Sequence, residues 1–128
     1  FQWLAFGVIK ARRSAGVAVG DGADERLMRA VRAQGNLLEY SVVFLGLLAL
    51  AEANGMPWWV LAPFSIAFLA GRVMHAFSLL RAESAEEGPD GMARYRWRVR
   101  GMTVTFMVIP AMAAVVVASV FLTVLGWS

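Results

Sequence analysis

The stretch RAQGNLLEYSVVFLGLLALA, residues 32–51, decides the fold class of this chain. It carries an arginine, an asparagine and a glutamate into an apolar run long enough to cross a bilayer. In lipid, each such group costs on the order of a few kcal/mol unless it is paired or faces an aqueous cavity. Arg32, Asn36 and Glu39 are spaced i, i+4 and i+7, so they share one helix face, and that face must turn toward other helices.

The composition places the whole chain among membrane proteins. Of its 128 residues, 59% are hydrophobic and only 16% are charged, too few polar residues to cover the surface of a small soluble domain. The basic residues flank apolar runs, which excludes a nucleic-acid-binding class. The chain has no cysteine and a single histidine, His75, which excludes thiolate and multi-histidine metal sites. We expect one transmembrane domain over residues 1–128.

Four membrane-spanning helices are predicted from the apolar runs and from the residues that begin and end them. The expected bounds are before Phe1 to about Arg13, Glu25 to Ala53, Pro57 to Leu80, and Arg96 to Gly126. Asp21 or Asp24 suits the cap of the second helix, and Gly55 suits its end. The first apolar stretch, FQWLAFGVI, covers roughly 14 Å of a ~30 Å hydrocarbon core, so we expect the native N-terminus to extend before residue 1.

The basic residues are distributed unevenly among the connections between these helices. They surround the first connection (Lys10, Arg12, Arg13, Arg26, Arg29 and Arg32) and the third (Arg81, Arg94, Arg96, Arg98 and Arg100), and the second has none. Positively charged connections remain on the cytoplasmic side of a membrane. The sequence therefore predicts that the first and third connections are cytoplasmic.

The polar residues of all four helices lie toward this same side. Arg72 and His75 form a second polar stripe on the third helix, Arg98 and Arg100 open the fourth, and Arg12 and Arg13 close the first. Arginines outnumber the one glutamate embedded in the membrane, which favours an anionic ligand, because guanidinium groups match carboxylates. Glu39 and Asn36 suit an amine or amide N–H of the same ligand.

Four plainer interpretations compete with a ligand site. Arg32 and Glu39 form only an ion pair in the first, and Arg72 is a structural partner of Glu39 in the second. In the third, His75 is a packed histidine with satisfied hydrogen bonds. In the fourth, Arg94, Arg96 and Arg98 are interfacial anchors that set the topology. The residues alone leave these alternatives open.

Several segments resemble the MAPEG family, the membrane-associated proteins in eicosanoid and glutathione metabolism. They are VIKARRSAGV (8–17), DERLMRAVRAQGNLLEYSVV (24–43), LAGRVMHAFSLL (69–80) and RVRGMTVTF (98–106), in order along nearly the whole chain. The R-A-x-x-N-x-x-E-Y block that begins at Arg32 is the most specific part. The VGDG link and the compact loops resemble bacterial members, which implies an integral protein of a bacterial inner membrane.

The resemblance implies a four-helix transmembrane bundle that assembles as a homotrimer, with glutathione bound between subunits near the cytoplasmic side. The glutathione contacts it implies are Arg12, Arg13, Arg32, Asn36, Glu39, Tyr40, Arg72 and His75. It gives the activation of the thiol to Arg100, with Arg98 as the alternative. A guanidinium within hydrogen-bond reach favours the thiolate, which then attacks a lipophilic electrophile arriving through the bilayer, in a transferase or peroxidase reaction.

Four positions depart from the pattern of the family's enzymes: Leu79, Val104, Val42 where a proline often stands, and Gly101 where one branch has a serine. Leu79 and Val104 stand where those enzymes carry tyrosines, so the binding half of the implied site is better preserved than the chemical half. The alternative function is therefore a non-catalytic membrane subunit that packs in a larger membrane complex. A transporter that uses Glu39 and Arg72 is a third possibility, because ionisable residues within a membrane often mark a pathway.

Overall fold

The computed structural model describes residues 1–82 and 91–126, and these residues contain four α-helices and one short π-helix. The elements are α1 (Gln2–Ala15), α2 (Glu25–Ala53), α3 (Trp58–Phe77), η1 (Ser78–Ala82) and α4 (Gly91–Val124). The fourth helix begins five residues before the predicted start, and the third passes into a π-helix that was not predicted. The side chain of Arg94 lies outside the described part of the chain.

The helix ends follow from local chemistry. Asp24 caps α2, because its Oδ1 accepts a hydrogen bond of 2.7 Å from the backbone N–H of Leu27. At the other end of α2, Gly55 adopts a left-handed φ of 80°, and the next backbone N–H, of Met56, donates to the carbonyl of Ala51 at 3.0 Å. The predicted bounds of this helix, Glu25 and Ala53, are confirmed. Of the two candidate capping residues, Asp21 and Asp24, it is Asp24 that caps the helix.

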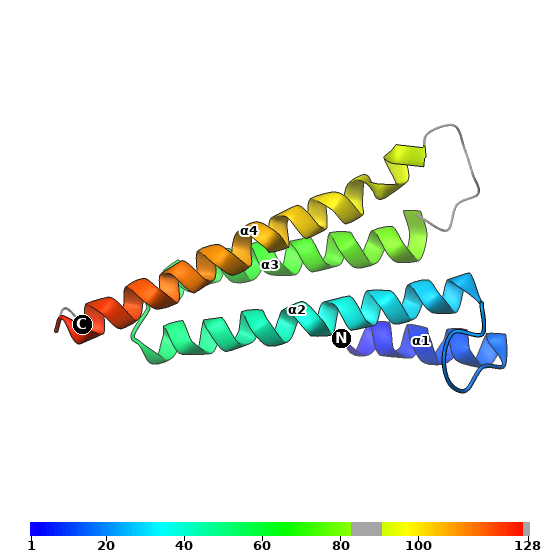
Figure 1. The fold of residues 1–128 in the computed structure, drawn as a ribbon, viewed down its shortest axis with the longest axis horizontal. Helices are drawn as coiled ribbons and strands as arrows, with labels where there is room; N and C mark the ends of the chain where they lie inside the picture. Colours follow the sequence, from blue (N-terminus) through cyan, green and yellow to red (C-terminus); the bar gives the residue numbers. More distant parts are fainter. Residues whose placement is uncertain (83–90, 127–128) are drawn as a thin grey trace.

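The helices lie roughly along one long axis (Figure 1). The short helix α1 lies beside the N-terminal half of α2, and α4 packs most extensively against α3. The link between α1 and α2 and the end of η1 lie at one end of the molecule, whereas the α2–α3 connection and the end of α4 lie at the other. The basic residues around the first and third connections therefore gather at one end of the bundle.

Length and surface identify a membrane protein. Within the described residues, three segments are long and apolar enough to cross a bilayer: Glu25–Ala53, Trp58–Arg81 and Tyr95–Val124. The outer faces of these helices expose large apolar side chains, including Val42, Ile66 and Phe121, each more than 60% exposed. Helix α1 has 14 residues and covers roughly 21 Å at a rise of 1.5 Å per residue. The prediction of an all-α membrane protein is confirmed.

Two glycines allow α3 and α4 to meet at backbone distance. A Cβ atom on Gly101 would lie 2.5 Å from the carbonyl oxygen of Gly71 and 2.9 Å from the backbone nitrogen of His75. Real side chains do not tolerate such distances, and both obstructing atoms belong to the backbone of α3. Small residues at helix crossings are typical of membrane proteins, where packing replaces the hydrophobic effect as the force between helices. This contact fixes α4 against the polar stripe of α3.

Toward the opposite end, the bundle closes around an apolar core. The rings of Phe44 and Phe68 are stacked, with centroids 4.2 Å apart and planes 4° apart. Met112 from α4 and Ala51 from α2 are fully buried in the same cluster. Dispersion contacts of this kind hold α2, α3 and α4 together at the end remote from the basic connections.

Candidate functional site

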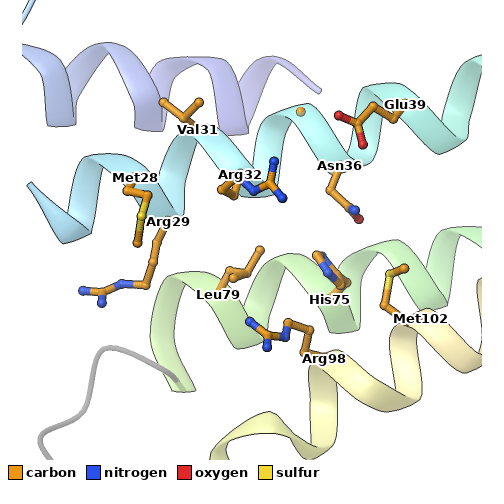
Figure 2. Close-up of a pocket in the computed structure, with 11 residues that line it drawn as sticks. Met28, Arg29, Val31, Arg32, Asn36, Glu39, His75, Leu79, Arg98 and Met102 are labelled. Carbon is orange, nitrogen blue, oxygen red and sulfur yellow. The ribbon is translucent and has the colours of Figure 1, made fainter. Parts of the chain in front are cut away.

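A cavity of about 650 Å³ lies between α2, α3, η1 and α4, on the side of the basic connections. Its lining residues are Met28, Arg29, Val31, Arg32, Gly35, Asn36, Glu39, His75, Leu79, Arg98 and Met102. Figure 2 shows Asn36 projecting from α2 toward His75 of α3 and Arg98 projecting from α4 beside Leu79, whereas the guanidinium of Arg29 turns away from the other labelled side chains. The structure thus brings together four predicted ligand contacts, Arg32, Asn36, Glu39 and His75, in one cavity.

The lining of the cavity is rich in cations. Arg29 and Arg32 contribute guanidinium groups from α2, and Arg98 contributes a third from α4, against one carboxylate, that of Glu39. Arg29 also forms an ion pair of 3.0 Å with the exposed Glu25, one helical turn earlier. Hydrogen-bond donors therefore exceed acceptors on the cavity wall, which suits a ligand that carries several oxygen acceptors.

A buried arginine lies directly behind this wall. Arg72 is only 3% exposed, and it donates hydrogen bonds to the Oδ1 of Asn36 and, at 2.5 Å, to the Oγ1 of Thr105. The Thr105 hydroxyl in turn donates to the carbonyl of Gly101 at 2.9 Å. These bonds join α2, α3 and α4 through polar contacts at the floor of the cavity.

The position of Arg72 determines which atoms Asn36 offers to a ligand. A guanidinium donates hydrogen bonds and accepts none, so Asn36 must turn its carbonyl oxygen toward Arg72. Its amide nitrogen, with two N–H donors, then remains for the cavity that Asn36 lines. In this arrangement the polar hydrogens of Asn36 that do not face Arg72 are donors, like the guanidinium of Arg32 on the same wall.

Aromatic rings hold the Arg72 guanidinium from the other sides. Its central carbon lies 4.8 Å from the ring centroid of Tyr40 and 6.0 Å from that of Phe68. Such contacts stabilise a cation that has left water. Tyr40, predicted to contact the ligand, does not line the cavity, and it supports Arg72, with its ring edge against Phe106 at 6.0 Å. The Nε of Arg72 is buried and has no hydrogen-bond partner among the described residues.

The plainer interpretations of the polar residues can now be compared with the structure. In residues 1–82 and 91–126, the partners of Arg72 are Asn36, Thr105 and carbonyl or sulfur atoms of α4, and Glu39 is not among them. Arg32 and Glu39 are both exposed, and the ion pair on this part of α2 joins Arg29 to Glu25. Within the described residues, Arg32 and Glu39 therefore do not form the ion pair of the first interpretation. His75 is buried and also lines the cavity, so packing and ligand contact are compatible there.

Three other predicted site residues lie outside the cavity. The Nη1 of Arg12 donates to the carbonyl of Gly20 at 2.7 Å and closes the α1–α2 link, while Arg13 is exposed. Arg100 is exposed on α4, with its guanidinium 5.6 Å from the ring centroid of Trp97. Of the two α4 arginines considered for thiol activation, Arg98 lines the cavity and Arg100 does not. The role of Arg100 in activating the thiol stays a prediction from the family resemblance.

Some residues of the site were not predicted from the sequence. Thr105 on α4 accepts a hydrogen bond from Arg72 and so connects α3 to α4. The sequence feature that could have indicated this role is a polar residue in an apolar helix, one turn after Gly101. Met28 and Met102 line the cavity with no distinguishing sequence pattern. Within the described residues, no three His, Asp or Glu side chains gather as a metal site requires.

The fold and the cavity together define an integral membrane protein with a cation-lined cavity inside a helical bundle. A family model described as the MAPEG family matches residues 1–118. The chain belongs to the MAPEG family.

Two curated relatives match most of the chain. Both are called inner membrane protein YecN, one from Escherichia coli strain K12 and one from Escherichia coli O6:H1. Each is 32% identical to this chain over 103 residues, which cover 80% of this chain and 70% of the relative. No solved structure matches the chain.

Proposed function

We propose that this protein binds glutathione in the cavity between α2, α3 and α4 and activates its thiol toward a lipophilic electrophile. The observation that carries the proposal is the convergence of Arg29, Arg32, Asn36, Glu39 and Arg98 on one cavity of about 650 Å³. The cavity lies in a membrane bundle, within reach of substrates dissolved in lipid. Membership of the MAPEG family supports glutathione as the thiol.

The chemical groups of glutathione match those of the cavity wall. The tripeptide carries two carboxylates, one amine, two peptide groups and a thiol. Arg29 and Arg32 are suited to the carboxylates, and Glu39 is suited to the amine. Asn36 offers its amide N–H groups to a peptide carbonyl, because Arg72 occupies its oxygen. Arg72 in this proposal is a positioning residue, and its contact with the ligand runs through Asn36.

We assign the stabilisation of the thiolate to Arg98, the α4 guanidinium that lines the cavity. A free thiol has a pKa of about 8.5, so a nearby permanent cation raises the thiolate fraction at neutral pH. The sulfur then forms a bond to an electrophilic carbon, and the leaving group departs with its electron pair. The thiol proton is released to water before the attack. In the related peroxide reduction, the thiolate attacks one oxygen of the O–O bond, which forms an S–O bond while the alkoxide leaves and takes up a proton. A second glutathione thiol then displaces water from the resulting sulfenic acid and gives glutathione disulfide.

A homotrimer is part of the proposal. Arg12, Arg13 and Arg100 belong to the implied site but lie outside the cavity of the single chain. In a trimer, these cations of one subunit contact a ligand that is bound where two subunits meet. The relatives are called inner membrane proteins, which supports a bacterial inner membrane as the location of the bundle. The positive-inside rule places the α1–α2 and α3–α4 connections in the cytoplasm, where glutathione is available.

A second candidate function is a non-catalytic membrane subunit that binds a thiol ligand without reacting it. The observation that favours it is Leu79, which lines the cavity with an apolar side chain where family enzymes carry a tyrosine. Val104, the other such position, packs against the apolar core. Neither residue offers a hydroxyl to a thiolate.

A conjugation assay separates the two functions. Purified protein in detergent is incubated with glutathione and a panel of lipophilic electrophiles: an aryl halide, an unsaturated carbonyl and a lipid hydroperoxide. We expect turnover that Arg98→Ala reduces at least about tenfold, the effect of losing one stabilising contact to a developing anion. A larger loss in Arg100→Ala than in Arg98→Ala would transfer the role to Arg100. No turnover with any electrophile, together with intact glutathione binding, would favour the non-catalytic subunit.

A further inference from the structure

A second set of cavities runs along the side of α2 that faces α1, between α1 and the end of α3, and one of them shares Arg29 and Leu79 with the first cavity. The largest, about 520 Å³, has a cationic mouth formed by Lys10, Arg26, Arg29 and Arg81. It continues past Gly7 into a smaller apolar cavity of about 260 Å³. Trp3 and Leu80 line both, and they also line a third cavity of about 250 Å³ that reaches Leu69 and Val73 on α3. We call these three cavities the α1 groove.

The α1 groove is basic at its mouth and largely apolar elsewhere, although Lys10 also lines the cavity of about 260 Å³ and Arg72 and Arg81 line the cavity of about 250 Å³. Its mouth lies on the side of the basic connections, and its apolar part is lined by residues such as Leu4, Phe6 and Phe77. Among the described residues that line it, no carboxylate is present. Among the described lining residues, the amine of a ligand such as glutathione finds no acid partner. A free phosphate would use only the mouth and leave the apolar part uncovered.

We propose that the α1 groove binds one anionic phospholipid. The headgroup phosphate lies among Lys10, Arg26 and Arg81, and one acyl chain passes Gly7 and Trp3 into the apolar cavities. Basic pockets between membrane helices on the cytoplasmic side are suited to anionic lipid headgroups, because each Lys or Arg near that surface attracts them. The long stems of Lys10 and Arg26 allow both charges to reach the headgroup level. The proposal does not depend on glutathione binding.

Two matched pairs of variants test whether lipid binding depends on the cations at the mouth of the α1 groove and on the open space within it. Lys10→Gln/Arg26→Gln removes two cations from the mouth, and Arg13→Gln/Arg96→Gln removes two exposed cations that do not line the groove. Gly7→Phe fills the groove, and Gly46→Phe adds the same ring to α2 away from it. A Cβ on either glycine meets nothing within 4 Å, so both variants should fold.

Native mass spectrometry of the delipidated protein measures binding of phosphatidylglycerol and of phosphatidylcholine with the same acyl chains. We expect tighter binding of phosphatidylglycerol, weakened about thirtyfold by Lys10→Gln/Arg26→Gln. Gly7→Phe should weaken it about tenfold, equivalent to withdrawing roughly two methylenes from the groove. The two control variants should retain wild-type binding.

Four outcomes would overturn the proposal. They are equal binding of both lipids, equal losses in the two charge variants, no effect of Gly7→Phe, and displacement of the lipid by inorganic phosphate at the same concentration. If Gly7→Phe changes the oligomer mass and leaves lipid binding unchanged, the groove is a contact between copies of this chain. Glutathione binding measured by calorimetry on Gly7→Phe should stay at the wild-type value, because Gly7 does not line the other cavity.

Discussion

The two halves of the α2–α3–α4 bundle are built on different principles. Near the α2–α3 connection, the stacked rings of Phe44 and Phe68 and the buried side chain of Met112 fill the space between the helices. Near η1, the Gly71–Gly101 contact brings α3 and α4 together, while a cavity of about 650 Å³ separates them from α2. One half is packed to hold the bundle, and the other leaves room for a ligand.

The same contrast appears between two arginines. Arg72 is 3% exposed, and its hydrogen bonds go to Asn36 and Thr105, so it links three helices. Arg32 lies one turn before Asn36 on α2, is exposed, and lines the cavity. A guanidinium with protein partners contributes to structure, and a guanidinium on a cavity wall is available to a ligand. Variants should therefore separate stability from binding.

The largest effect is expected from Gly101→Ala. The added methyl group would meet the backbone of Gly71 and His75 and push α4 away from α3. Overpacking of this kind should lower the free energy of unfolding by about 3 kcal/mol. Thermal unfolding in detergent, followed by circular dichroism, measures it. Gly46→Ala, which adds a methyl group in open space, is the control, and an equal change in both would contradict the close contact.

Next in size is the pair Arg72→Met and Arg32→Met. Arg72→Met should destabilise the bundle by about 2 kcal/mol, because Asn36 and Thr105 lose their shared partner. Arg32→Met should change stability by less than about 0.5 kcal/mol and weaken glutathione binding about tenfold or more. Unfolding and calorimetry on both proteins provide the comparison. Equal losses of stability in the two variants would show that Arg32 supports the structure as Arg72 does, which would contradict the contrast.

A smaller effect is expected from Asn36→Asp. The aspartate keeps an oxygen for Arg72 but loses the two amide N–H donors that the proposal assigns to the ligand. Stability should therefore remain near the wild-type value, and glutathione affinity should fall about tenfold, the cost of leaving one acceptor unpaired. Gln34→Glu, which introduces the same charge on α2 outside the cavity lining, controls for electrostatics. Unchanged affinity in Asn36→Asp would show that the amide nitrogen does not contact the ligand.

The fold was predictable where local chemistry decides it. The length of the apolar runs predicts the helices. Asp24 followed by Glu25 predicts where α2 begins, because an aspartate caps a helix and an acidic residue suits its first turn. The spacing of Arg32, Asn36 and Glu39 likewise predicts a shared face, and all three line one cavity. Periodicity along one helix is enough for such statements.

The rest of the site depends on the register between helices, which periodicity within a helix does not determine. The contact between Arg72 and Thr105 requires α3 and α4 to cross at Gly71 and Gly101. The role of Arg12 in the α1–α2 link depends on how that short link folds back toward its own helix. Whether Arg98 or Arg100 faces the cavity also follows from the rotation of α4 about its axis.

The most direct test of the account is glutathione binding by isothermal titration calorimetry, with wild-type protein beside Glu39→Gln. We expect saturable binding to the wild type and a loss of at least about tenfold in the variant, because the ligand amine loses its charged partner. Gln keeps the shape of the side chain, and Glu39 is exposed, so the variant should fold normally. Absence of binding to the wild type at millimolar glutathione, or equal binding to both proteins, would contradict the proposed site.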